Sequence, residues 1–457
     1  MRVSFVMLGH MAYGGLAQHS AILVKQLREL GCEVLPLVGL APPHNDEVSL
    51  NELDYTFDAF NVADYVLRDK PALVRWLIGW YARHQVANGR PQKVKSNQAP
   101  AFDIDYKRLF EELMFNPDDS DLQKIDKKRR DFRPDVDYVC ELTVSGYFSL
   151  FTNLSVPLVV AAQGYEISQR QGIDVISVIR RNERLIDTVV SGSHTNVEEN
   201  IARDLPFLLS RTKVVHYGIV DDETFDMPPE QAMERTERFV RPSDEYVIMA
   251  LSRIDVEKGT DLALHALRIL LNQGVNARLR LVGDTVAGGH FRQTIEEKIA
   301  MMDLGEKVDY VGFVESKADK VALLKTSDVF LAPFIKSEPF GLVYTEAMAA
   351  GLPIIAPDQG AGKEIITWDG RRAGLVYRSQ DTGQMADAIK YLMDNPEEAR
   401  AMGRDARQLV AQHFNARQMA QGFYDVFSEA IDRRRIGSRS YHYPRSQDNL
   451  TTAARRH

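Results

Sequence analysis

The chain has 457 residues, 44% of them hydrophobic and 26% charged, and a formal net charge of −8. That length exceeds one ordinary core and predicts two domains of roughly 200 residues each. The negative charge argues against a general affinity for nucleic acid, whose phosphate backbone requires a positive surface. Apolar runs stay shorter than the ~20 residues that span a bilayer, and the N-terminus lacks signal-peptide features. We therefore expect a cytoplasmic protein with Cys32 and Cys140 as reduced core thiols.

The first elements predict a β-α-β unit. A strand is expected over residues 3–8, a turn carries Gly14 and Gly15, and a helix follows over residues 16–30. The next strand is expected over residues 34–38. Four later apolar runs predict further strands of the same sheet: 138–140, 157–162, 188–190 and 213–215.

The segment 71–134 between these strands is charged and predicted to be helical. Within it, residues 73–81 combine aromatic side chains with a few arginines, a pattern compatible with a membrane-surface helix. The basic face is thin, so a buried helix of the first domain is the favoured interpretation. A polar stretch that contains Pro228-Pro229 and many charges, residues 226–245, is predicted to link the two domains.

A second α/β alternation begins after this linker. The five strands expected here are 246–251, 279–283, 308–311, 329–331 and 354–356, and helical sequence extends from 381 to about 434. Two doubly wound units in succession predict a cleft between the carboxyl ends of their strands. We assign residues 1–225 to the first domain, 246–417 to the second, and 437–457 to a disordered tail.

The most informative segment is 337–353, a turn and a helix between two strands. Glu338 lies in the turn, and Glu346 lies on the helix that begins at Gly341. Carboxylates beside free helix N–H groups at the mouth of a parallel sheet suit a polyhydroxylated ligand that carries phosphate. Because apolar residues follow Glu346, its helix is expected to be buried, where an unpaired carboxylate would be costly.

A second motif follows the first strand of the second unit. Arg253 and Lys258 lie five residues apart on a loop that ends at Gly259. A planar guanidinium and a mobile ammonium on one loop can both contact a diphosphate. Two solvated surface cations would be the ordinary interpretation, but the loop's position at a strand's carboxyl end favours phosphate binding.

Together these motifs closely resemble the signature of retaining glycosyltransferases of family 4, the glycosyl transferases group 1. The resemblance covers most of residues 247–375 and the first half only loosely. It implies the GT-B fold: two Rossmann-like domains facing across a cleft, the donor on the second and the acceptor on the first. It also implies that a C-terminal helix near residues 418–436 packs back on the first domain.

The resemblance assigns roles residue by residue. It implies that Arg253 and Lys258 contact the donor diphosphate, that Glu338 contacts the transferred sugar, and that Glu346 contacts the ribose. The remaining donor-binding positions are expected to act mainly through their backbone: Gly14, Gly15, Val314, Phe340, Gly341 and Leu342. Gly14 and Gly15 lack the spacing of a dinucleotide fingerprint, which argues against hydride chemistry.

One position departs from the family pattern. Family members carry a His-Gly pair after the strand 158–162, whereas this chain has Gln163 followed by Gly164. Gln163 can still form hydrogen bonds to a sugar but cannot carry a charge. His194 is a conceivable substitute, although a helix-start histidine more often has a structural role.

The expected reaction moves a hexose from a UDP- or GDP-sugar to an acceptor hydroxyl with retained configuration, without metal or other cofactor. The acceptor and the oligomeric state cannot be read from the sequence. Three alternatives remain: a glycoside hydrolase using the two glutamates, a non-catalytic nucleotide-sugar-binding protein, and a disaccharide synthase or phosphorylase of the trehalose or sucrose type. The diphosphate-binding loop argues against the hydrolase.

Overall fold

The computed structural model describes residues 1–7, 15–41, 58–61, 119–142, 155–163, 175–220, 222–240, 245–284, 290–314 and 316–440. Several sequence-based expectations lie outside these residues: Gly14, the aromatic segment 73–81, and the tail beyond residue 440. In the parts that are described, no helix combines the length and apolar character needed to cross a membrane. Cys32 and Cys140 are buried and form no disulfide, as predicted.

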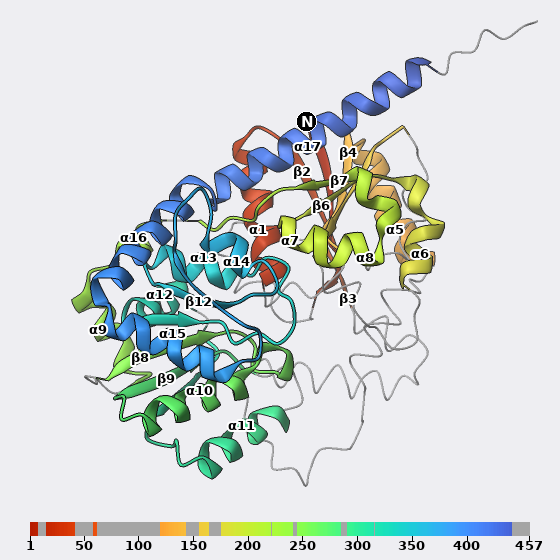
Figure 1. Ribbon diagram of the computed structural model, residues 1–457. Helices are drawn as coiled ribbons and strands as arrows, with labels where there is room; N and C mark the ends of the chain where they lie inside the picture. Colours follow the sequence, from red (N-terminus) through yellow and green to blue (C-terminus); the bar gives the residue numbers. More distant parts are fainter. Residues whose placement is uncertain are drawn as a thin grey trace, which may run out of the picture.

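The first domain is built on a seven-stranded sheet with the order β3-β2-β1-β4-β5-β6-β7 (Figure 1). Every pairing is parallel. The interior strand β5 is buried at each residue, which explains why its sequence is a continuous apolar run instead of an alternating one. The strands are β1 (Arg2–Met7), β2 (Glu33–Ala41), β3 (Asp58–Asn61), β4 (Val136–Val139), β5 (Leu158–Ala162), β6 (Ile186–Ser191) and β7 (Thr212–Val214).

The second domain contains a six-stranded parallel sheet with the order β10-β9-β8-β11-β12-β13. Its strands are β8 (Tyr246–Leu251), β9 (Ala277–Val282), β10 (Val308–Gly312), β11 (Val329–Leu331), β12 (Ile354–Pro357) and β13 (Gly374–Tyr377). The predicted α/β architecture with two doubly wound sheets is therefore confirmed. In each sheet the strand order reverses beside the first strand, between β1 and β4 and between β8 and β11.

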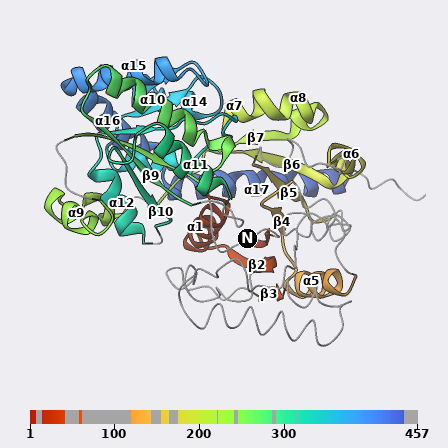
Figure 2. The ribbon, with the colours of Figure 1, turned by 90° about the horizontal axis from the view of Figure 1, so that it is seen from below.

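Helices connect the strands and cover the sheets (Figures 1 and 2). In the first domain they are α1 (Gly15–Glu29), α5 (Asp119–Phe132), α6 (Val175–Arg181), α7 (His194–Asn196), a π-helical turn (Val197–Ile201) and α8 (Ala202–Asp204). The others are α9 (Pro229–Thr236), α10 (Thr260–Asn272), α11 (His290–Met301), α12 (Lys317–Lys325), α13 (Leu342–Ala349), α14 (Gly362–Ile366), α15 (Thr382–Asp394), α16 (Pro396–Gln412) and α17 (Ala416–Ser440). Short 3-10 helices cover Glu183–Leu185, Pro206–Arg211, Glu223–Asp226 and Val256–Lys258.

The segment predicted as a polar linker contains α9, which packs against α12 of the second domain. Arg235 of α9 donates to Asp319 of α12 at 3.0 Å, and Asp319 is only 3% exposed. Charged residues that suggested a solvated connection therefore hold this helix to the second domain. The pairing partner lies 84 residues away in sequence, so local composition could not reveal it.

The C-terminal helix α17 returns to the first domain (Figure 1). It packs against α1 and the strands β4, β5 and β6. The rings of Phe423 and Phe427 lie 5.4 and 5.5 Å from the ring of Tyr138 on β4, and all three residues are fully buried. At the far end, Arg434 pairs with Asp187 at 2.7 Å. The last helix thus connects the second domain to the sheet of the first.

Candidate functional site

The sequence-predicted binding loops lie at the reversal point of the second sheet. One loop follows β8 and carries Arg253 and Lys258; the other follows β11 and carries Glu338. In open parallel sheets, the loops at such a point diverge and leave room for a ligand at the carboxyl ends of the strands. The topology therefore brings two segments about 80 residues apart to the same edge of the sheet.

The loop after β8 has a fixed local structure. Asp255 accepts a hydrogen bond from the backbone N–H of Lys258 at 2.9 Å and caps the 3-10 turn Val256–Lys258. Gly259 then adopts a left-handed conformation with φ of 65°, and a Cβ there would lie 2.0 Å from the carbonyl oxygen of Pro333. Glycine is thus required by both backbone conformation and packing. Arg253, about half exposed, pairs with Asp255 at 3.2 Å.

Lys258 and Glu338 form an ion pair across the two loops, with each side chain 20% exposed. The Lys258 ammonium also lies 4.7 Å from the centre of the Phe334 ring, an arrangement that gives a cation–π attraction. The lysine that was predicted to bind phosphate and the glutamate that was predicted to bind sugar are therefore neighbours. Their opposite charges offset each other in this ion pair.

The helix α13 begins directly after the Glu338 loop. Its N-cap is Gly341, with φ of 79° and no side-chain cap. The side chain of Phe340 is buried, with ring contacts to Tyr217 at 5.2 Å and Phe414 at 6.2 Å, so only its backbone can face a ligand. Leu342, the first helical residue, is 9% exposed. An uncapped helix N-terminus is suited to a phosphate or a hydroxyl oxygen.

Glu346, on α13, is only 4% exposed, and its Oε1 atom has two partners. Lys320 of α12 donates to its Oε1 atom at 2.5 Å, and Gln18 of α1 donates to the same atom at 3.0 Å. The carboxylate predicted to contact ribose thus lies at a point where the first domain contacts the second. Its ion pair with Lys320 accounts for a buried charge in an apolar helix.

The remaining predicted positions are more dispersed. Gly15 is the first residue of α1, whereas Gly14 lies outside the described residues. Gln163 follows β5 and donates to the carbonyl oxygen of Cys140 at 3.2 Å. Val314 follows β10 and packs in part against the hydrophobic core.

The first domain contacts the Glu338 loop directly. The Ser193 hydroxyl donates to the carbonyl oxygen of Pro339, and the Ser337 hydroxyl donates to Glu199. Glu199 also accepts the backbone N–H of Gly360 at 3.2 Å. These contacts flank Glu338 on both sides in sequence. The position of the candidate catalytic acid therefore depends on residues of both domains.

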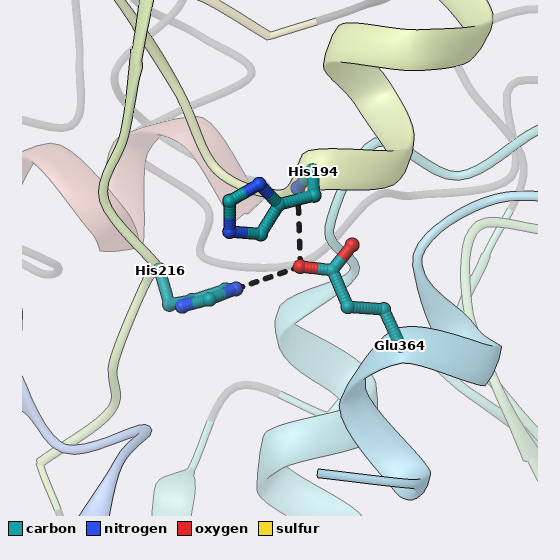
Figure 3. Close-up of side chains that lie close together, drawn as sticks. All are labelled: His194, His216 and Glu364. Atoms are coloured by element: carbon teal, nitrogen blue, oxygen red, sulfur yellow. Dashed lines mark hydrogen bonds and ion pairs between the residues drawn. The ribbon is translucent and has the colours of Figure 1, made fainter.

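A second interdomain cluster surrounds Glu364 on α14 (Figure 3). Its carboxylate accepts the backbone N–H groups of His194 at 3.0 Å and Thr195 at 2.8 Å, the Thr195 hydroxyl at 2.8 Å, and His216 Nε2 at 2.7 Å. Burial opposes ionisation, but the bonds from His216, Thr195 and His194 outweigh it and lower the pKa of Glu364 to about 2. His194 thus lies in this cluster.

This low pKa predicts a pH-dependent contribution to stability. A glutamate in an unfolded chain has a pKa of ~4.3. Between about pH 4.3 and pH 2, Glu364 is therefore protonated less in the folded state than in the unfolded state. The contribution of Glu364, at most about 3 kcal/mol, is therefore complete above about pH 5 and is lost as the pH falls toward 2. The measurement is the difference in unfolding free energy between wild type and Glu364→Gln from pH 7 to pH 3. A difference that stays constant over this pH range would contradict the prediction.

Sequence reasoning missed the partners that complete the site: Gln18, Glu199, His216, Lys320 and Glu364. For Glu364 a signal exists, because Gly360 and Gly362 follow β12 and an acid comes two residues after Gly362. That pattern repeats the strand–glycine–helix arrangement at Glu338. Lys320 and Gln18 lie on ordinary amphipathic helices, where no local pattern distinguishes them from solvated residues.

Comparisons with known proteins agree with this geometry. Residues 233–409 match the family model of glycosyl transferases group 1. A lipopolysaccharide core biosynthesis mannosyltransferase of Rhizobium meliloti is 27% identical over 252 residues, which are 54% of this chain and 67% of that protein. A D-inositol 3-phosphate glycosyltransferase of Saccharomonospora viridis is 32% identical over 195 residues, 42% of this chain and 44% of that protein. The chain thus spans 67% of the length of the first relative and 44% of the length of the second.

The structural comparison extends over the whole fold. The crystal structure of HepE from Anabaena in complex with UDP-glucose superposes with a TM-score of 0.69, covering 94% of this chain and 100% of that one at 17% identity. At this identity the likeness establishes the fold alone. The fold is GT-B, as the sequence resemblance implied.

Proposed function

We propose that this protein is a retaining glycosyltransferase that moves a hexose from a nucleotide diphosphate sugar to an acceptor hydroxyl. The observation that carries the proposal is the pairing of Lys258 with Glu338 at the reversal point of the second sheet. A cation for phosphate and a carboxylate for sugar hydroxyls lie side by side, next to the uncapped N-terminus of α13. The match of residues 233–409 to glycosyl transferases group 1 includes both residues.

Binding of the donor would separate this ion pair into two useful contacts. The Lys258 ammonium turns to the diphosphate together with the exposed guanidinium of Arg253, which offers a planar fork. Glu338 is then free to accept hydrogen bonds from the sugar. Glu346, held by Lys320 and Gln18, accepts the ribose hydroxyls. The backbone N–H groups of α13 complete the anionic subsite.

The proposed reaction is a front-face displacement. The bond between the anomeric carbon and the diphosphate oxygen breaks, and the acceptor oxygen bonds to the same face of that carbon. The acceptor proton passes to the departing phosphate oxygen. Arg253 and Lys258 offset the negative charge that develops on the diphosphate. No protein nucleophile is required, and the two cations take the place that a divalent metal holds in other transferases.

The first domain is proposed to bind the acceptor. Gln163 follows β5 at the position where family members have a histidine that reaches the donor sugar, and its amide is proposed to bind a hydroxyl of that sugar. The donor is a UDP- or GDP-sugar: the HepE structure contains UDP-glucose, whereas the Rhizobium meliloti relative is a mannosyltransferase. No feature of the described site favours one nucleotide over the other.

Thermal stabilisation by nucleotide sugars tests the proposal. A donor present at 100 times its dissociation constant should stabilise the protein by about 2.7 kcal/mol, which gives a clear rise in Tm. We expect such a shift with one of UDP-glucose, UDP-N-acetylglucosamine, GDP-mannose or their nucleotides, unchanged by EDTA. Absence of any shift would overturn the donor-site assignment, and loss of the shift in EDTA would overturn metal independence. A shift without sugar transfer to any of a broad acceptor panel would identify a binding protein instead.

A further inference from the structure

Three metal-ligand side chains come together at the second interdomain cluster, apart from the residues proposed to act on the donor. His194 begins α7, His216 follows β7, and Glu364 lies on α14. One ligand atom from each lies within 4.8 Å of the other two. Figure 3 shows the two imidazoles and the carboxylate converging from three separate segments, two in the first domain and one in the second.

We propose that His194, His216 and Glu364 form a binding site for a first-row transition-metal ion, with Zn²⁺ the best match. Two imidazole nitrogens and one carboxylate oxygen are a donor set that zinc accepts, leaving a fourth position for water. Mg²⁺ and Ca²⁺ prefer oxygen ligands and do not suit a site with two imidazoles. The site is separate from the metal-independent chemistry proposed above.

The geometry requires only local adjustment. Zinc–ligand distances near ~2.0–2.1 Å place tetrahedral ligand atoms about 3.3 Å apart. His216 Nε2 and Glu364 Oε1 are now 2.7 Å apart, so they must separate by about half an ångström. His194 must move closer, and its side chain is exposed. Within the described part of the chain its imidazole makes no hydrogen bond, and its recorded contact is with the His216 ring at 5.9 Å. It can therefore turn at little cost.

The surroundings of Glu364 favour a bound cation. Its low pKa keeps the carboxylate ionised. The second oxygen, Oε2, is held by the backbone N–H and hydroxyl of Thr195, both at 2.8 Å. Such outer contacts fix the orientation of a metal-binding carboxylate. Oε1 would still accept the hydrogen bond from the backbone N–H of His194, but its hydrogen bond with His216 would be replaced by a bond to the metal. His216 would bind the metal through its unprotonated Nε2.

A metal ion here would connect the two domains. His194 and His216 belong to the first domain and Glu364 to the second, so a bound ion would link the domains in place of the His216–Glu364 hydrogen bond and beside the bonds from the His194 and Thr195 backbone. An ion that binds only when the two domains are in contact at this cluster stabilises that arrangement by mass action. We therefore expect Zn²⁺ to raise the Tm and to restrain relative movement of the domains.

Metal titration of matched variants tests the site. The full chain, stripped with chelator and dialysed, is titrated with Zn²⁺ by calorimetry and with Co²⁺ by visible absorption, with Mg²⁺ as a control. His194→Ala removes an exposed imidazole without breaking a recorded side-chain hydrogen bond, and His216→Ala removes the second ligand. The control is His265→Ala, an exposed histidine on α10 of the second domain.

The proposal predicts that wild type and His265→Ala each bind one more metal ion per chain than His194→Ala and His216→Ala do. With Co²⁺, that additional ion should show the visible absorption of tetrahedral coordination. Loss of a direct ligand should weaken that site at least about 10- to 100-fold, the range known for supporting residues alone. Equal binding by all four proteins would overturn the proposal, as would the absence of binding to wild type. If His216→Ala fails to fold, His194→Ala still decides the result.

Discussion

Lys258→Ala should lower the rate of sugar transfer by about 10²- to 10³-fold or more, the usual effect of removing one group that stabilises developing charge. In the free protein Lys258 is paired with Glu338, and in the proposed complex it faces the diphosphate. Its removal leaves the leaving group with Arg253 alone. Because the ion pair is partly exposed, the expected loss of stability is small. The measurements are kcat for transfer and the Tm of the variant.

The control for this variant is Lys390→Ala, which breaks an ion pair of similar length between exposed residues on α15. It should leave transfer unchanged. Near-normal turnover in Lys258→Ala, with the fold intact, would remove the phosphate role of this lysine. A rise in KM with constant kcat would instead mean that Lys258 stabilises the bound donor equally in the ground state and the transition state.

Gly259→Ala should destabilise the second domain by about 2–5 kcal/mol and abolish donor binding. Two costs add: the left-handed conformation, about 1–2 kcal/mol for a residue with a Cβ, and the overlap of that Cβ with the Pro333 carbonyl, about 1–3 kcal/mol. The Cβ would lie 2.0 Å from that oxygen. To relieve the overlap, the loop that carries Arg253 and Lys258 must move away from the loop that leads to Glu338.

Gly274→Ala separates these two costs. Gly274 has φ of 78°, close to that of Gly259, but nothing lies within 4 Å of its Cβ position. Gly274→Ala should therefore lose only the stability that the left-handed conformation costs, about 1–2 kcal/mol, and should still bind the donor. Denaturant unfolding of both variants, with nucleotide binding measured alongside, gives the comparison. Equal destabilisation would mean that the contact with Pro333 contributes nothing.

The central strands could be predicted from sequence because they are continuous apolar runs. The predicted strand 246–251 matches β8, and 329–331 matches β11. Two of the four edge strands, β3 and β13, were not predicted, whereas β7 and β10 were; β13 (Gly374–Tyr377) comes shortly after two arginines and exposes Val376. This segment is a strand because it pairs with β12, and such pairing depends on the tertiary structure and not on the local sequence.

The candidate site could be predicted only as a set of loops. Strand–turn–helix patterns indicate that Lys258 and Glu338 lie at the carboxyl ends of parallel strands, and the structure places them in contact. Sequence could not indicate that Glu346 pairs with Lys320, or that Gln18 reaches it from the other domain. Such contacts depend on how the domains face each other, which no local pattern encodes.

The contacts of Ser193 and Glu199 with the Glu338 loop have a consequence for the fate of the donor. If the domains separate, the loop loses partners on both sides of its acid. A nucleotide sugar could then rest on the second domain without an assembled catalytic centre beside its anomeric carbon. Solvent attack would be slow in that state, and rapid cleavage would be confined to closed molecules. The same hydrogen bonds that shape the site thus also protect an activated sugar from wasteful hydrolysis.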